Sequence, residues 1–474
     1  MVPKRVWTAA LTLVLILGLL AGCAPAPTPQ VIEKVVKETV VVEKPVPQTV
    51  VVEKQVTKEV VKEVTKEVIK EVPKDKTIVT LAYNNYFNVT FGPAAPPFEE
   101  LKKAVAAKYP DITLQLNVMP YEAGPWHDNY VTWFMAKDGT TDLLGVGAYW
   151  TAEFGEADWL LPLNDKVDKK ILDKLNPAYL AAHTYKGKLL GLGPWWGGIG
   201  GLYYRKDLLE KYNLQPPKTY DDVVKIAQTI MKDNKDLTGW TWPALNDWVL
   251  VNRWIEFLNG FGGKYFDDAG KCAMASPEAT AALKYMVNLI DSGISPKEIT
   301  TWKEEDSMVR FVSGKAIFHT GRQDMMFWLD DPKKSQIGGK WGFIPNPAQP
   351  NGKPAGFYEG WAFSINKYSK HPDAALKVLE VMFDFPMQKA FNLSQGPLQA
   401  NMDIYKDPDV IKNNPNMPLI EAVASTAVPP IPSPAYAELA GILAEELHSA
   451  LTKLKTPEAA LKNACTRIDN IKKK

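Results

Sequence analysis

The feature that most constrains this chain is an abrupt change of composition near residue 76. Residues 24–76 contain no Trp, Tyr or Phe, and only Trp7 of the 15 Trp in the chain lies before them. A stretch without aromatic side chains has little material for a packed core. The fold must therefore lie in the remaining residues, about 400 of the 474.

The first 22 residues have the pattern of a signal peptide. Lys4 and Arg5 precede an apolar run over residues 11–20, which is too short to span a bilayer comfortably. The run leads into Leu20-Ala21-Gly22-Cys23, which resembles the lipobox at which bacterial signal peptidase cuts before a lipidated Cys. We expect removal of residues 1–22, lipidation of Cys23 and anchoring at the extracytoplasmic face of the cell membrane.

Residues 23–76 are predicted to be a lipidated tether that holds a folded domain away from the membrane. From residue 58 the unit Lys-Glu-Val-x recurs four times, so Val falls at every fourth position and forms no stable helical stripe. Pro45, Pro47 and Pro73 interrupt the segment, and mixed charges keep such a linker solvated. A short coiled coil over residues 55–72 is the alternative.

From residue 77 onward the sequence predicts an α/β domain with a mostly parallel sheet. Strand patterns over residues 77–81, 112–118 and 142–146 alternate with a helical pattern over 97–108. Later helices are expected to begin after Thr219, Ser276 and Thr456, because each hydroxyl residue is followed within three positions by an acid.

Charge and motifs exclude several classes of function. The 55 Lys and Arg nearly balance the 54 Asp and Glu, which argues against nucleic acid as a partner. Gly191-Leu192-Gly193 is followed by Pro, so it is no dinucleotide fingerprint, and the five His lack metal-ligand spacing. We therefore expect no cofactor and no metal. Cys272 and Cys465 are expected to be buried thiols, with a disulfide between them as the alternative.

Several motifs, in order along the chain, resemble one protein family. They lie at residues 185–194, 202–208, 216–220, 311–317, 371–375 and 456–461, the first reading Tyr-Lys-Gly-Lys-Leu-Leu-Gly-Leu-Gly-Pro. Over residues 78–471 the chain is similar to the family 1 extracellular solute-binding proteins of ABC transporters. It departs from the family pattern at Arg205, where Asn is usual, and in the Gly-rich run 197–201.

The resemblance implies a periplasmic-binding-protein-like α/β fold of two lobes joined by a hinge of three crossings. Lobe one would comprise residues 77–198 plus 319–360, and lobe two residues 199–318 plus 361–474. A ligand would lie in the cleft while the lobes close by hinge bending. The resemblance also implies a monomeric binding protein, not an enzyme, that passes its ligand to two permease subunits driven by an ATPase.

The resemblance places the three crossings near residues 194–202, 317–322 and 358–362. Aromatic and polar residues near these crossings favour a carbohydrate ligand, and an oligosaccharide more than a monosaccharide. A sugar ring offers an apolar face to an aromatic platform and hydroxyls to polar side chains. The candidate ligand-binding residues are the platforms Trp150, Trp195, Trp196, Trp242, Trp248 and Trp361 and the polar residues Asn84, Asp247, Arg322 and Glu359.

Each candidate also has a structural interpretation. Any one of these Trp could be a core residue. Arg322 could form an ion pair with Asp324 or Glu359, and Glu359 could simply cap its crossing. A secreted glycosidase using Asp247 and Glu359, a surface sensor or adhesin on the same fold, and a phosphorylated polyol as ligand are the functional alternatives.

Overall fold

A computed structural model of the chain describes residues 76–90, 94–194, 197–396 and 398–471. The described residues all belong to one compact body. The predicted signal peptide, Cys23, the tether with its alternative coiled coil, and Trp195 and Trp196 lie outside the described residues. Among the described residues, no helix combines the length and the apolar character that crossing a membrane requires.

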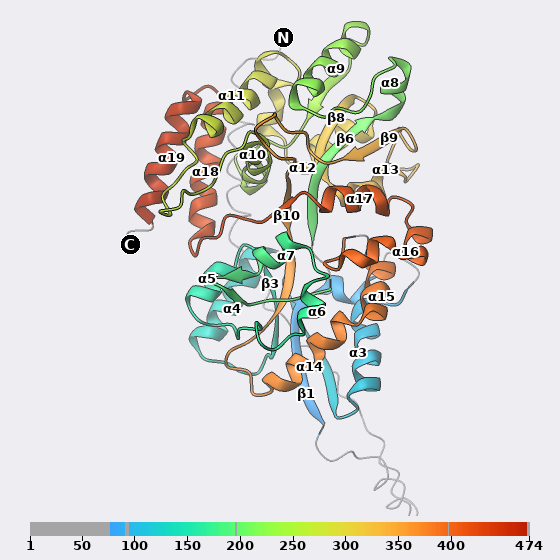
Figure 1. Cartoon of the computed structure of the whole chain (residues 1–474), viewed down its shortest axis with the longest axis vertical. Helices are drawn as coiled ribbons and strands as arrows, with labels where there is room; N and C mark the ends of the chain where they lie inside the picture. The colour runs from blue at the N-terminus through green and yellow to red at the C-terminus, as the bar shows by residue number, and fades with distance from the viewer. Residues whose placement is uncertain (1–75, 91–93, 195–196, 397, 472–474) are drawn as a thin grey trace, which may run out of the picture. The chain divides into compact units, whose positions relative to one another are not determined.

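Four strands form the first sheet, in the order β11-β3-β1-β2 (Figure 1). They are β1 (Thr77–Asn84), β2 (Ile112–Met119), β3 (Leu143–Gly147) and β11 (Trp361–Ile365). β1 runs parallel to β2 and β3, whereas β11 runs antiparallel to β3. The predicted strands 77–81, 112–118 and 142–146 are confirmed, because their apolar patterns match strands buried in this sheet.

Helices from two distant parts of the chain pack on this sheet. They are α3 (Pro97–Lys108), α14 (Pro372–Phe383) and α15 (Phe385–Gln395), with α14 and α15 both contacting α3. Two further helices, α4 (Ala123–Met135) and α5 (Thr151–Glu156), carry aromatic residues of the same core. On α4 the Tyr130 hydroxyl donates to the Ala82 carbonyl of β1, at 3.2 Å. The sheet and these helices share one hydrophobic cluster.

The second sheet has six strands, five of them in the order β12-β10-β6-β8-β7, with β9 pairing to β6. The strands are β6 (Gly198–Arg205), β7 (Thr238–Thr241), β8 (Ala316–Arg322), β9 (Trp341–Ile344), β10 (Gly356–Glu359) and β12 (Ala427–Val428). β6 pairs antiparallel with β8, β9 and β10. The prediction of a mostly parallel sheet is therefore correct for the first sheet and wrong for the second.

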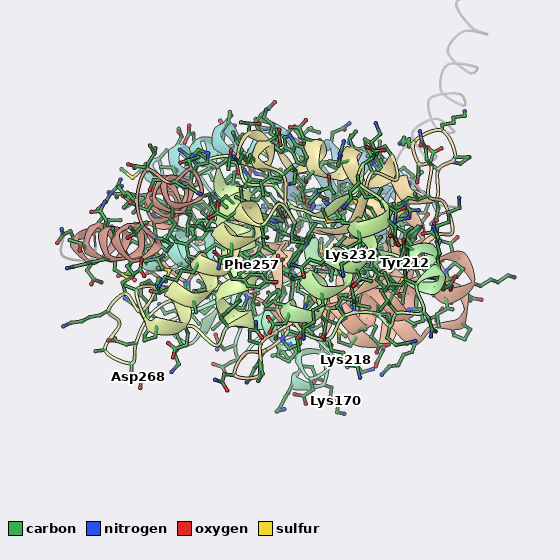
Figure 2. All side chains as sticks on the ribbon, turned by 90° about the horizontal axis from the view of Figure 1, so that it is seen from above. Lys170, Tyr212, Lys218, Lys232, Phe257 and Asp268 are labelled. Atoms are coloured by element: carbon green, nitrogen blue, oxygen red, sulfur yellow. A yellow bond between two sulfur atoms is a disulfide. The ribbon has the colours of Figure 1, made fainter. Side chains whose placement is uncertain are left out.

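The helices around the second sheet begin where their caps predict. Helices α9 (Tyr220–Asp233), α11 (Pro277–Asp291) and α19 (Pro457–Ile471) follow Thr219, Ser276 and Thr456, and each of these hydroxyls accepts a hydrogen bond from a backbone N–H of the first turn. Further helices of this part are α8 (Lys206–Lys211), α10 (Trp248–Gly260), α12 (Glu304–Val312), α17 (Met417–Ala424) and α18 (Tyr436–Leu451). Figure 2 shows Lys170, Lys218 and Asp268 directed outward, while Phe257 of α10 is buried in the interior.

The expected division into lobes is wrong at two segments. We call the first sheet with the helices packed on it the first unit, and the second sheet with its helices the second unit. The expected boundaries place residues 361–395 in lobe two, but β11 pairs with β3, and α14 and α15 pack on α3 in the first unit. The expected boundaries place residues 319–359 in lobe one, but β9, β10 and the last residues of β8 all pair with β6. Apolar alternation identifies a strand without revealing which sheet the strand joins, so these boundaries could not be fixed from local pattern.

One disulfide and one network of polar contacts hold the last helices of the chain in place. Cys272 and Cys465 of α19 form a disulfide that joins positions 193 residues apart, so the expectation of two buried thiols is wrong. Their Cα atoms lie 5.2 Å apart, a separation that a disulfide spans. The distance arises only when α19 packs on the rest of the fold, which is why spacing along the chain gave no sign of it.

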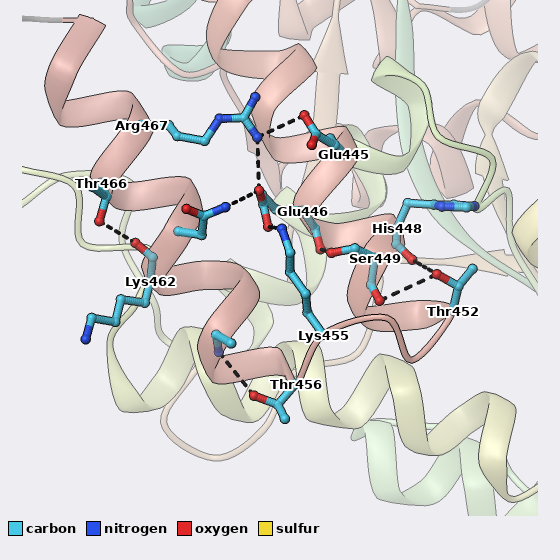
Figure 3. A network of polar contacts seen from close by, with 12 residues as sticks. Glu445, Glu446, His448, Ser449, Thr452, Lys455, Thr456, Lys462, Thr466 and Arg467 are labelled. Atoms are coloured by element: carbon cyan, nitrogen blue, oxygen red, sulfur yellow. Dashed lines mark hydrogen bonds and ion pairs between the residues drawn. The ribbon is translucent and has the colours of Figure 1, made fainter.

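Figure 3 shows the second link, centred on the fully buried Glu446 of α18. Its carboxylate accepts hydrogen bonds from Lys455 Nζ at 2.6 Å, Asn463 Nδ2 at 2.5 Å and Arg467 Nη1 at 2.9 Å. Burial alone would raise the pKa of Glu446, but the bonds from Lys455 and Arg467 outweigh it and lower the pKa. A buried carboxylate satisfied in this way fixes α19 against α18.

Candidate functional site

An aromatic assembly lies where the last residue of β3 pairs with the first residue of β11. Trp361, the first residue of β11, stacks on Trp126 of α4 with ring centroids 4.3 Å apart and planes 12° from parallel. Trp150 stands edge-on to both, at 5.9 Å from Trp126 and 5.2 Å from Trp361. Trp126 is fully buried and Trp150 is 7% exposed, whereas Trp361 is only partly buried. The assembly thus supports one indole that keeps accessible surface.

Tyr149 connects this assembly to the second sheet's unit. Its ring lies edge-on to Trp361 at 6.0 Å and stacks on Tyr436, the first residue of α18, at 6.1 Å. Gly147 makes room for it, because a Cβ there would lie 2.9 Å from the Tyr149 ring. Burial raises the pKa of Tyr149, and the nearby Glu359 carboxylate raises it further. Rings from both units therefore meet beside Glu359.

A charged group borders the aromatic assembly, and we call it the Arg322 cluster: Arg322, Glu304, Asp324 and Glu359. Arg322 Nη2 donates to Asp324 Oδ2 at 3.0 Å and Nη1 to Glu359 Oε2 at 3.3 Å, while Nε lies 3.7 Å from Glu304 Oε1. Asp324, then Glu359 and Glu304, raise the pKa of Arg322, so its positive charge is secured. The ion pairs offered as an alternative role for Arg322 therefore both form.

The Gly-rich run explains how Arg322 reaches Glu359. Arg322 lies opposite Gly200 in the β6–β8 ladder, and Glu359 lies opposite Gly198 in the β6–β10 ladder. A Cβ at Gly198 would stand 2.5 Å from Arg322 Cδ, so only Gly lets the side chain cross β6. The unusual Gly content at 197–201 therefore belongs to strand β6, whose two faces are both crowded.

The structure brings Trp150, Trp361, Arg322 and Glu359 together and places the other described candidates elsewhere. Trp242 is wholly buried and its Nε1 donates to Ser295 Oγ at 3.0 Å, so its prediction as a platform is wrong. A side chain inside the second core cannot meet a ligand.

The remaining three candidates lie at element ends. Asn84 Oδ1 accepts from the Tyr86 N–H at 3.0 Å, and Asp247 Oδ1 accepts from the Val249 and Leu250 N–H groups, so both cap the helices that follow them. Trp248 is 48% exposed at the start of α10. Trp248 keeps enough exposed surface to stack on a ligand, whereas the side chains of Asn84 and Asp247 cap the helices that follow them.

Sequence reasoning missed several residues of this site. Trp126, Tyr149, Tyr436 and Glu304 are described above, and Asp324 was considered only as an ion-pair partner of Arg322. Tyr86 and Tyr121 were also missed, and they are 42% and 70% exposed with ring centroids 5.9 Å apart. Asp324 and Arg322 influence the pKa of Tyr86, which burial and Tyr121 raise, so this pair lies near the Arg322 cluster. Tyr149 could have been found, because it adjoins Trp150 directly after a predicted strand.

Within the described part of the chain, no three His, Cys, Asp or Glu side chains gather as metal ligands would.

Comparison with known proteins gives a consistent result. A family model described as bacterial extracellular solute-binding protein matches residues 93–388. A probable ABC transporter-binding protein of Deinococcus radiodurans is 30% identical over 388 residues, covering 79% of this chain and 91% of its own. A mannitol-binding protein of Pseudomonas aeruginosa is 25% identical, covering 58% of this chain and 63% of its own.

A solved structure extends the likeness to the fold. The maltose-bound MalE3 of T. maritima is 30% identical, with a TM-score of 0.67 over 83% of this chain and 99% of that one. The expectation of a periplasmic-binding-protein-like α/β fold is therefore confirmed.

Proposed function

We propose that this chain, which belongs to the bacterial extracellular solute-binding protein family, captures a carbohydrate at the Trp361–Arg322 site and delivers it to an ABC importer. The observation that carries the proposal is the aromatic assembly, in which a stacked indole with accessible surface adjoins a hydrogen-bonding ion pair. The mannitol and maltose named for the two relatives support a polyhydroxylated ligand.

The site offers both parts of a sugar-binding surface. The apolar face of a pyranose would stack on Trp361, which Trp126 holds in place from the other side. Glu359 and Asp324 would accept hydrogen bonds from the sugar hydroxyls, and Arg322 would donate them. Because Trp361 belongs to the first sheet and Arg322 to the second, a bound sugar would contact both units.

Further aromatic surface supports an oligosaccharide. Tyr86 and Tyr121 form a second exposed aromatic pair near the Arg322 cluster, and Trp248 offers a third surface at the start of α10. A single ring would not need all of these, whereas successive units of an oligosaccharide could each stack on one.

The mechanism would be a shift in population between open and closed arrangements. Three chain segments pass between the two sheets, leading from β3 to β6, from β10 to β11 and from β11 to β12. A ligand that contacts both units favours the arrangement in which both contacts are made. The permease would then recognise the closed form.

The chain would bind without chemistry. A glycosidase needs two carboxylates directed at one bond. Asp247 instead caps α10 and Glu359 pairs with Arg322, so the two carboxylates considered for that role have other partners. We therefore favour a monomeric binding protein over an enzyme.

The anchor is the remaining part of the proposal. Lipidation of Cys23 would hold the protein on the extracytoplasmic face of the membrane, with residues 24–76 as the tether. Expression of Cys23→Ser in the native host, followed by fractionation, should release the protein from the membrane. Retention in the membrane fraction would contradict lipid anchoring.

Titration calorimetry tests the carbohydrate assignment. The purified protein would be titrated with maltose, maltotriose, longer maltodextrins, mannitol and a panel of β-linked oligosaccharides. Binding of at least one at micromolar concentration, with a change in Trp fluorescence, is expected. No binding by any of them at millimolar concentration would contradict the assignment.

A further inference from the structure

The Arg322 cluster is unusually rich in negative charge for a site that contains an arginine. One guanidinium meets three carboxylates, those of Glu304, Asp324 and Glu359, within 3.7 Å. The side chain of Arg322 is 32% exposed, and that of Asp324 is 47% exposed, the most of the four. Nη1 and Nη2 each donate one hydrogen bond to a carboxylate, and Nε faces Glu304 at 3.7 Å without a hydrogen bond to it.

The next nearest buried charges are one arginine and one glutamate. Arg253 of α10 pairs with Glu256 at 3.1 Å, and both are almost fully buried. Arg253 acts on the pKa of Glu304, which shows that this pair lies close behind the cluster. Burial raises the pKa of Glu304 and outweighs the lowering by Arg322 and Arg253, while Glu359 and Asp324 raise the pKa further.

We infer that the Arg322 cluster makes the site selective for uncharged carbohydrates over their anionic counterparts, and that Asp324 is a specificity-determining residue. The inference rests on the proposed function, since it concerns the same site. An arginine without acidic neighbours would favour a phosphate or carboxylate on the ligand. Here an anion that approached Arg322 would also meet the carboxylates of Glu304, Asp324 and Glu359.

The three carboxylates would lie close to the incoming anion. Like charges at such distances repel strongly where water is partly excluded. An uncharged sugar meets no such obstacle, because its hydroxyls can donate to the carboxylate oxygens that remain unused by Arg322. A phosphorylated polyol, considered as a ligand from the sequence, is therefore disfavoured.

Paired ligands test the inference. Calorimetry would compare maltose with maltobionate and mannitol with mannitol 1-phosphate, using the full-length mature protein. We expect the uncharged member of whichever pair binds to bind at least about 30-fold more tightly than the anion. Raising NaCl from 20 to 500 mM should narrow this ratio, because salt screens the repulsion and leaves uncharged ligands unaffected.

Variants make the assignment specific to Asp324. Asp324→Asn should narrow the ratio of the two affinities at least about threefold, because it removes one of the carboxylates that repel an anion and keeps the size of the side chain. Asp331→Asn, which removes a carboxylate that pairs with Lys334 and not with Arg322, is the matched control and should leave the ratio unchanged.

The outcomes separate this inference from the proposed function. An anion that binds as tightly as its uncharged counterpart, or a ratio unchanged in Asp324→Asn, would overturn the selectivity and leave carbohydrate binding intact. Failure of all four ligands and of the wider oligosaccharide panel would overturn the proposed function, and the selectivity with it.

Discussion

The Trp residues of the first and second units differ in the contacts and the burial of their rings. In the first unit Trp126, Trp150 and Trp361 contact one another, and the series ends at an indole with accessible surface. In the second unit Trp240 and Trp242 are fully buried, and their Nε1 atoms donate to Thr320 and to a serine of the same unit. The first set ends in one indole with accessible surface, whereas the second lies wholly in the core.

The difference teaches that the two units contribute different chemistry to the site. The first unit supplies the aromatic face through β11. The second unit supplies the charged groups through β8 and α12, together with Trp248 at the edge. Because a sugar needs both kinds of contact, neither unit alone would hold it. The predictions below test this division, beginning with the largest expected effect.

Replacing a core Trp of the second unit should cost mainly stability. Trp242→Ala removes a fully buried indole and leaves a cavity, so the free energy of unfolding should fall by about 3–5 kcal/mol. Urea denaturation followed by circular dichroism measures the change. A stability loss below about 1 kcal/mol together with lost sugar affinity would instead make Trp242 a platform and break the comparison.

The disulfide should stabilise the second unit by a smaller amount. The Cys272→Ala, Cys465→Ala double variant should lose about 2–4 kcal/mol of unfolding free energy, because the unfolded chain gains freedom across a long loop. Thermal unfolding with and without reductant measures the same quantity in the unaltered protein. A melting temperature that is identical under both conditions would show that the bond contributes nothing.

Replacing the accessible Trp should cost mainly affinity. Trp361→Ala should weaken binding of the best sugar roughly tenfold or more, about 1.4 kcal/mol, by removing the stacking face. The matched control is Trp159→Ala, because Trp159 is also partly buried and stacks on Phe134 at 4.8 Å. If both variants lose affinity equally, the effect is one of stability and Trp361 belongs to the core.

A pH-dependent contribution of His127 is expected to be the smallest effect. Its Nε2 lies 3.0 Å from the Glu153 carboxylate, and this hydrogen bond raises the pKa of His127. The stabilisation is therefore fully present below the unfolded pKa, near 6.5, and is lost as pH rises through the higher folded pKa.

Because both side chains are partly exposed, His127→Gln should cost less than about 1 kcal/mol at pH 5.5 and less still at pH 8.5. Urea denaturation of both proteins at the two pH values measures the difference. An equal cost at both values would show that the charge of His127 does not stabilise the fold.

The elements of this fold could be predicted from sequence better than their assembly. Local signals placed β1, β2 and α3 closely, and Thr219 marked the start of α9 through its capping hydroxyl. These signals depend on neighbours within a few residues. The pairing of β11 with β3 and the disulfide of Cys272 depend on contacts between distant segments, so no local pattern could reveal them.

The residues of the candidate site could likewise be predicted only where a local signal in the sequence pointed to them. Position after a strand or at a crossing correctly grouped Trp150 and Trp361 with Arg322 and Glu359. Position alone failed for Trp242, because a Trp just after a strand looks the same in sequence whether its ring faces the core or the solvent.

The central claim is that one sugar contacts the aromatic face of the first unit and the charged cluster of the second. A crystal structure of the protein with its tightest-binding oligosaccharide tests it most directly. We expect one sugar ring stacked on Trp361, with hydroxyls of the same ligand hydrogen-bonded to Glu359, Asp324 or Arg322. A ligand held by one unit alone, or bound away from Trp361, would contradict the claim.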